Sequence, residues 1–284
     1  MWIAEELGYF ASSGSEVVLK QFSSGVSTSK ALAAGDINLA NSSEFAFVNN
    51  VMRNNDLRIV ASISRTNSVN LFGRADRGIS DASDLAGKKI GVTRRGIGEF
   101  FLGEYLSIHG ISLADVELVN LRPPAIVKDI SDGSIDAAIT WEPSVFLAKQ
   151  ALGENFVQLP DQDSYYYHFV VAGKRDWLSS KQKDVQNVLA ALIKAQIYVS
   201  ENPEAAQAIM AKRFDLDPEF VRSTWDKYIL EVTLLQTLLS LMEQEAYWLI
   251  ENNLIDATSA PNFLDVIDAD PLSAIAPKAV QLIR

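Results

Sequence analysis

The loop TRRGIG at positions 93–98 combines residue types that bind a small anion. It stands between an apolar segment and a predicted helix, so backbone N–H groups and the positive end of the helix dipole would converge there. Arg94 or Arg95 would add a guanidinium fork for a sulfonate or carboxylate, beside the backbone donors of Gly96, Ile97 and Gly98. The same residues also suit a tight strand–helix turn that carries two solvated arginines.

Three further loops follow predicted strands and carry hydroxyl, amide or glycine groups. Their candidate ligand residues are Gly25 and Ser27, Ser42 and Ser43, and Thr66 and Asn67. Each loop could be an ordinary helix N-cap. Because ligands of open α/β sheets bind where the strands reach their carboxyl ends, the four loops together indicate an anion site.

Aromatic residues mark two more candidate positions. Trp141, followed by Glu142 and Pro143, ends an apolar segment, where its indole would form a wall or a donor for a ligand. An aromatic plug between strand and helix explains it equally well. Tyr167, in the run YYYH at 165–168, belongs either to a crossover between lobes or to one face of an ordinary strand.

Known catalytic and metal-binding patterns are missing from the sequence. It has no G-x-S-x-G, no G-x-x-x-x-G-K-[ST] and no H-E-x-x-H motif. The two histidines, His109 and His168, lack metal-ligand spacing, and there is no cysteine. We therefore expect a binding protein rather than an enzyme, with no metal and no cofactor.

The composition is that of an ordinary globular protein. The chain has 284 residues, 48% hydrophobic, which allows one large or two moderate domains. Its net charge of −11 argues against nucleic acid as a partner. No apolar run approaches the roughly 20 residues of a membrane span, and the first residues do not resemble a signal peptide.

Strands and helices are predicted to alternate up to about residue 172, after which helices dominate. Predicted strands occupy 16–22, 37–40, 57–64, 69–75, 89–93, 116–121, 137–141, 155–159 and 166–172, and the principal helices are 2–10, 27–34, 43–52, 96–109, 126–131 and 234–252. Such alternation predicts α/β units with a mainly parallel sheet flanked by helices.

An ordered set of motifs resembles one known family. AEELGYF at 4–10, KALAAGDI at 30–37, DLAGKKIGV at 84–92, and GSIDAA at 133–138 followed by WEP at 141–143 are similar to the nitrate/sulfonate/taurine family of solute-binding proteins of ABC importers. The similarity extends over nearly the whole chain.

The resemblance implies a type II periplasmic-binding-protein fold with two α/β lobes joined by two crossovers. Lobe 1 would comprise residues 1–70 and 172–284, lobe 2 residues 71–171, and the crossovers would lie near 68–74 and 164–172. A small anionic solute would bind in the cleft between the lobes, to the loop residues named above, for delivery to a membrane permease. The protein would be periplasmic or anchored to the cell surface by a lipid.

The chain departs from this family at its start, where the family's first strand is missing. An unpaired sheet edge would favour a dimer or strand exchange. Two alternatives remain open: a sensory domain of a membrane receptor, and binding or synthesis of a thiamine-pyrimidine precursor on the same fold. The synthase branch carries a cysteine-rich motif, which this chain lacks.

Overall fold

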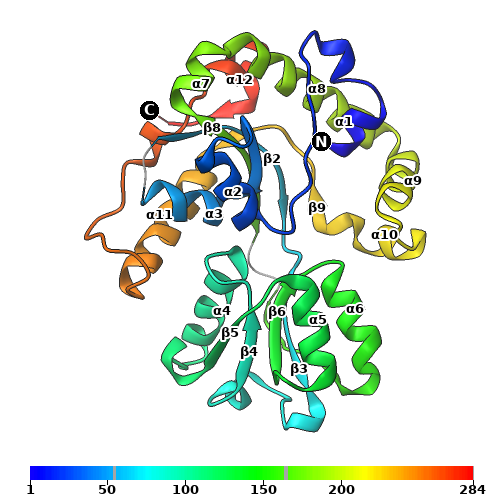
Figure 1. The fold of residues 1–284 in the computed structure, drawn as a ribbon, viewed down its shortest axis with the longest axis vertical. Coiled ribbons are helices and arrows are strands. Elements are labelled where there is room, and N and C mark those ends of the chain that lie inside the picture. The colour runs from blue at the N-terminus through cyan, green and yellow to red at the C-terminus, as the bar shows by residue number, and fades with distance from the viewer. Residues whose placement is uncertain (54–55, 163–165, 284) are drawn as a thin grey trace. The chain divides into compact units, whose positions relative to one another are not determined.

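The computed structural model describes residues 1–53, 56–162 and 166–283, which form two compact units (Figure 1). Unit 1 contains residues 1–22, 27–66 and 168–284, and unit 2 contains residues 23–26 and 67–167. Ser164 and Tyr165, where the second crossover was expected to begin, lie outside the described residues.

Unit 1 is built on a four-stranded sheet in the order β1-β8-β2-β9. Its strands are β1 (Leu39–Ser43), β8 (Tyr167–Lys174), β2 (Leu57–Thr66) and β9 (Tyr228–Ile229), and β10 (Leu234–Leu235) pairs with β11 (Val280–Gln281) separately. The helices are α1 (Trp2–Glu6), α2 (Gly25–Ala34), α3 (Glu44–Val51), α7 (Arg175–Ser180), α8 (Gln182–Glu201), α9 (Pro203–Phe214), α10 (Pro218–Thr224), α11 (Gln236–Glu251) and α12 (Asp270–Ile275).

Unit 2 is built on a five-stranded sheet in the order β5-β4-β6-β3-β7. The strands are β5 (Glu117–Asn120), β4 (Lys89–Val92), β6 (Ala137–Trp141), β3 (Val69–Arg74) and β7 (Phe156–Gln158), with helices α4 (Ile97–Ile108), α5 (Pro123–Asp132) and α6 (Ser144–Leu152). Ile126 and Ile130, four residues apart on one face of α5, are fully buried in a core with Phe72 and Ile135. Gly133 ends α5 with φ 80°, a conformation that glycine adopts without strain.

The expectation of a mainly parallel sheet was wrong, because both sheets are mixed. β4 is parallel to β5 and β6; α4 connects β4 to β5, and α5 connects β5 to β6. β3, however, is antiparallel to β6 and β7, and β8 is antiparallel to β1. Only strands joined through a helical crossover have to run in parallel, whereas β3 and β8 enter their sheets without one.

The strand expected at residues 16–22 is also absent from the structure. The segment is extended, and Val17 and Leu19 are half-buried while Val18 is 74% exposed, so its side chains alternate as they do in a strand. Within the described residues it forms no ladder with another strand. An alternating pattern records which face is buried, but strand formation also needs a neighbouring backbone to pair with.

Among the residues that the structure describes, no helix is long and apolar enough to cross a membrane. The same residues contain no group of three or more histidine, aspartate or glutamate side chains arranged to hold a metal ion.

Candidate functional site

The loop between β4 and α4 has the strand–loop–helix geometry expected of an anion site. Gly96 is the N-cap of α4, and a Cβ added there would lie 3.1 Å from the carbonyl oxygen of Thr93. The Thr93 hydroxyl donates to the carbonyl of Leu121 at 2.8 Å, and the Arg94 N–H donates to Asn120 Oδ1 at 3.2 Å. Both bonds fix the loop to the end of β5.

A carboxylate of the chain itself occupies part of this loop. Glu99, in the first turn of α4, is 1% exposed, and its Oε1 lies 2.5 Å from Arg94 Nε. That contact lacks hydrogen-bond geometry, whereas Glu99 Oε2 accepts a bond from the Arg95 N–H at 2.5 Å. Glu99 therefore compensates the charge of Arg94 and the N-terminus of α4.

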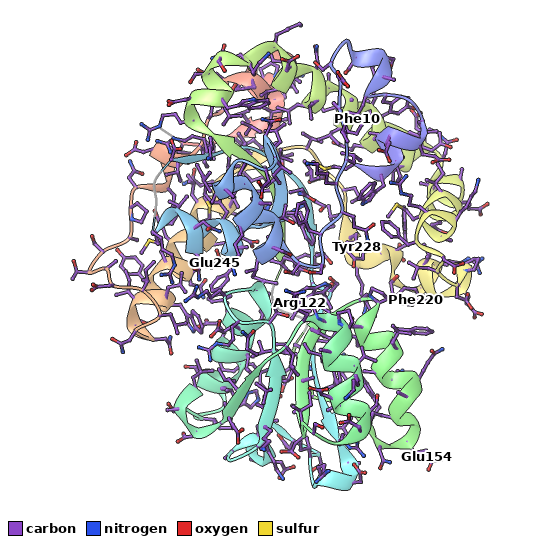
Figure 2. The ribbon with its side chains drawn as sticks, in the orientation of Figure 1. Phe10, Arg122, Glu154, Phe220, Tyr228 and Glu245 are labelled. Atoms are coloured by element: carbon purple, nitrogen blue, oxygen red, sulfur yellow. The ribbon has the colours of Figure 1, made fainter. Side chains whose placement is uncertain are left out.

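Arg95 is exposed and has φ 63°, and its guanidinium forms no ion pair with any residue that the structure describes. Arg122 is also exposed and stands at the N-cap of α5, just beyond β5 (Figure 2). These two arginines are the cations that this end of the sheet offers to a ligand. Sequence analysis missed Arg122, although its place between a strand and a Pro-initiated helix was a usable signal.

Several predicted residues of unit 2 share one edge of its sheet. β4 and β6 are parallel neighbours, so the loop 93–98 and Trp141 follow strand ends on the same side. Val69 pairs with Trp141 in the antiparallel ladder, which brings Asn67, two residues earlier, to this edge as well. The Glu142 carboxylate accepts the Phe146 N–H at 3.0 Å and so caps α6.

Tyr167 is buried in unit 2 at the beginning of β8. Its hydroxyl lies 3.0 Å from Ser68 Oγ, and its ring meets that of Phe101 edge-on at a centroid distance of 5.9 Å. Only 2% of its surface is exposed. A ligand would therefore reach the Tyr167 hydroxyl only after local rearrangement.

The predicted residues of unit 1 lie at strand and helix ends. Ser43 ends β1, and its hydroxyl accepts the Ala46 N–H at 3.3 Å, which caps α3. Ser42 is buried and accepts a bond from Ser29 Oγ of α2 at 3.3 Å. Thr66, fully buried, ends β2. Gly25 and Ser27 belong to the first turn of α2, with Gly25 assigned to unit 2 and Ser27 to unit 1.

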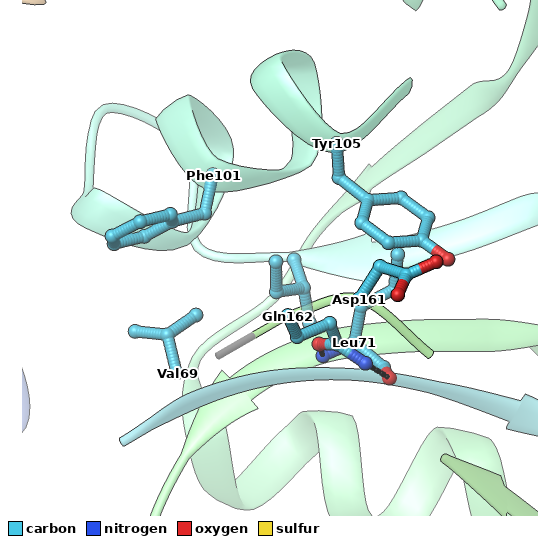
Figure 3. A pocket seen from close by; sticks show the side chains of 7 residues that line it. Val69, Leu71, Phe101, Tyr105, Asp161 and Gln162 are labelled. Atoms are coloured by element: carbon cyan, nitrogen blue, oxygen red, sulfur yellow. Dashed lines mark hydrogen bonds between the residues drawn. The ribbon is translucent and has the colours of Figure 1, made fainter. Parts of the chain in front are cut away.

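Unit 2 contains a small apolar pocket (Figure 3). Its walls come from β3, α4, β6 and the segment that follows β7: Val69, Leu71, Phe101, Tyr105, Ile139, Asp161 and Gln162. The free volume is about 20 Å³, which suits one water molecule. Burial raises the pKa of Tyr105 to about 12, and the buried hydroxyl has no hydrogen-bond partner. The pocket is too small for a sulfonate.

Comparison with known proteins gives similarity in sequence and in fold. The family model described as NMT1/THI5 like matches residues 1–206. A protein of Brucella abortus named as a binding protein is 25% identical over 221 residues, covering 76% of this chain and 67% of the relative. The taurine-binding periplasmic protein of Escherichia coli is 36% identical over 135 residues, covering 47% of this chain and 41% of the relative.

Among solved structures, the alkanesulfonate-binding protein SsuA from Xanthomonas axonopodis pv. citri, bound to MOPS, is similar with a TM-score of 0.82. The match covers 94% of this chain and 93% of that one at 16% identity, so it bears on the fold alone. Together these matches confirm the resemblance seen in the motifs. The chain belongs to the NMT1/THI5-like family and has the type II periplasmic-binding-protein fold.

Proposed function

We propose that this chain is the solute-binding component of an ABC importer and captures a small oxyanion of the sulfonate, taurine or nitrate kind. The observation that carries the proposal is the loop after β4, where Arg95 has no ion-pair partner among the described residues and stands before the first turn of α4. A guanidinium next to a glycine-capped helix start is well suited to an oxyanion.

The family supports this reading. The E. coli relative is named for taurine and the X. axonopodis structure for alkanesulfonates. Proteins that deliver such solutes to a permease act outside the cytoplasmic membrane, so we place this chain in the periplasm or on a lipid anchor at the cell surface. A small anionic solute and a membrane permease would be its partners.

In this proposal unit 2 supplies the cationic side chains of the ligand site. Arg95 and Arg122 would neutralise the anion, and Trp141 would contact its alkyl part. The hydroxyls of Ser42, Ser43 and Thr66 and the backbone of 25–27 remain further candidate donors.

The experiment is a binding assay by intrinsic tryptophan fluorescence, with thermal shift as a second readout. The panel would hold taurine, methanesulfonate and longer alkanesulfonates, nitrate, bicarbonate and a hydroxymethylpyrimidine. We expect saturable binding of at least one oxyanion. Arg95→Ala should weaken it by about 1.5–3 kcal/mol, or roughly 10- to 150-fold, the range for a charged hydrogen bond.

Lys183→Ala is the matched control, because it removes one exposed positive charge from α8. It should leave the affinity within about twofold if the effect of Arg95 is local, since screened charges far from a site contribute little. Equal losses in both variants would refute the assigned role of Arg95. Binding of the pyrimidine alone would favour the thiamine-precursor alternative.

A further inference from the structure

The side chain of Glu44 completes the ladder between β1 and β8. Ser43 pairs with Phe169 in the antiparallel register, so the next pair would join residues 44 and 168. The chain turns into α3 at this point, and the Glu44 carboxyl takes the place of a strand carbonyl, with its Oε1 accepting the His168 N–H at 2.9 Å. Glu44 thus links the end of β1, at Ser42 and Ser43, to the residue that follows Tyr167.

A second buried carboxyl faces Glu44 from α11. The two helices pack through Phe45 and Trp248, whose ring centroids are 5.9 Å apart. Glu44 and Glu245 are both 0% exposed. Figure 2 labels Glu245. Glu44 Oε2 and both carboxyl oxygens of Glu245 have no hydrogen-bond partner. Neither side chain forms an ion pair with any residue that the structure describes.

Within the part of the chain that the structure describes, no cation pairs with either carboxyl. From β8 comes His168, whose pKa is lowered to about 4 mainly by burial and then by Arg65, so it is neutral and lies 2.9 Å from Ser62 through its Nδ1. The charged group at the end of α3, Arg53, binds Asn49 and the Leu254 carbonyl. β1 and β10 have no charged side chain. The 3₁₀ segment Phe263–Val266 packs on α11, and its charged residue, Asp265, interacts electrostatically with Arg58.

Two ionised carboxylates in such surroundings are unfavourable, because burial and mutual repulsion both oppose the charge. Burial raises the pKa of Glu44 to about 8, although the backbone N–H groups of His168, Glu44 and Phe45 act in the opposite direction. Burial, reinforced by Glu44, raises the pKa of Glu245 well above its ordinary value. A protonated Glu245 would carry the O–H donor that the free oxygen of Glu44 lacks.

We propose that Glu44 and Glu245 form a proton-holding carboxyl pair that positions the end of β1 beside the start of β8, and that an anion bound near Ser42–Ser43 stabilises the uncharged pair. The coupling between anion binding and the carboxyl pair rests on the proposed function. Glu44 directly follows the two serines, so a negative charge on it repels the anion. The same charge weakens the packing of α11 against α3. By linkage, anion binding takes up a proton, and affinity falls as pH rises and Glu44 ionises.

The test measures the affinity for methanesulfonate and nitrate between pH 6.5 and 9.5, because neither anion changes its charge there. The wild type should bind about tenfold more weakly at pH 9.5 than at pH 6.5. A tenfold change corresponds to a pKa of Glu44 about one unit higher with the anion bound than without it. Glu44→Gln keeps an oxygen for the His168 N–H. It should bind within about threefold of the wild-type affinity at pH 6.5 and show a flat profile. Glu243→Gln, an exposed change on α11, should keep the wild-type slope.

A ligand-free measurement tests the pair separately. The ¹⁵N amide shift of His168 should titrate between pH 6.5 and 9.5 in the wild type and not in Glu44→Gln. In Glu245→Gln the same transition should stay close to the wild-type pH, because the amide is neutral and can donate to Glu44 as the protonated Glu245 does.

Each outcome decides one part of the proposal. A His168 amide that does not titrate refutes the proton-holding pair. A transition governed by added Na⁺ or Ca²⁺ instead of pH identifies a cation between the carboxyls and also refutes it. Equal pH slopes in the wild type and Glu44→Gln refute the coupling to ligand. If no anion binds at any pH, the proposed function fails and the coupling fails with it, whereas the amide titration still decides whether the pair holds a proton.

Discussion

Replacement of Glu44 by glutamine should stabilise the fold at alkaline pH and leave it nearly unchanged in acid. The glutamine has the shape of the carboxylic acid and keeps an acceptor for the His168 N–H, which lies 2.9 Å from the Glu44 oxygen. The substitution therefore removes the ionisable proton without opening a cavity. The change in unfolding free energy isolates the cost of keeping this group uncharged.

The sign follows from the raised pKa of the folded state. Below the ordinary value of 4.5 Glu44 is protonated whether the chain is folded or unfolded, so the full stability is present. As pH rises to about 8, the unfolded chain ionises while the folded chain retains its proton. Stability then falls by about 1.4 kcal/mol per pH unit, or roughly 4–5 kcal/mol in all. Above the folded pKa the loss is complete.

The assay is urea unfolding at pH 5 and at pH 8.5 of the wild type, Glu44→Gln and the exposed control Glu243→Gln. We expect Glu44→Gln to match the wild type within about 1 kcal/mol at pH 5 and to exceed it by several kcal/mol at pH 8.5. In thermal unfolding, that gain corresponds to about 10 °C for a chain of this size. If Glu44→Gln lost as much stability between the two pH values as the wild type, Glu44 could not be the group that ionises.

Three other changes test separate parts of the structure. Glu99→Gln should strengthen oxyanion binding about three- to tenfold in fluorescence titrations, because it releases Arg94; a weaker affinity would mean that Glu99 serves the ligand. Gly91→Ala should lower the unfolding free energy by about 1–3 kcal/mol, because its Cβ would lie 2.5 Å from Ile135 Cδ1, and Gly91→Ala with Ile135→Val should recover part of the loss. Arg213→Ala should lower the unfolding free energy by about 1 kcal/mol, because the guanidinium lies 4.4 Å from the ring centroid of Trp2 and 2.8 Å from Glu5. Arg213→Lys keeps the charge and should lose less stability; equal losses in the two variants would refute a planar stacking role.

Local sequence signals predicted the elements that local forces determine. The loop at 93–98 was identified because a glycine-bearing turn between an apolar strand and a helix is a local pattern, and Gly96 does cap α4. Trp141 was expected at a strand end and is the last residue of β6. In these cases a few neighbouring residues carry both the signal and the structure.

Pairing and burial depend on distant residues, and there sequence reasoning failed. The segment 16–22 has the alternation of a strand but no paired neighbour among the described residues. The directions of β3 and β8 follow from where the chain enters each sheet. Glu44 and Glu99 look like ordinary first-turn acids, and only tertiary packing makes them 0% and 1% exposed. Glu99 pairs with Arg94, which lies five residues earlier and before α4 begins, so the helical i,i+4 spacing gave no signal for this pair.

The two buried acids affect an anion site in opposite ways, and this makes the number of arginines a poor guide to affinity. Glu99 contacts Arg94 and accepts the Arg95 N–H, so it withdraws one positive charge and one backbone donor from the ligand. Glu44 lacks a cation and avoids repelling an anion only while it keeps its proton. Oxyanion affinity should then depend on Arg95, Arg122 and the protonation of Glu44 together. The combination Glu99→Gln with Glu44→Gln should bind methanesulfonate more tightly than the wild type at pH 9.5 and without the wild-type pH dependence; if the two gains in binding free energy are additive, the acids act independently.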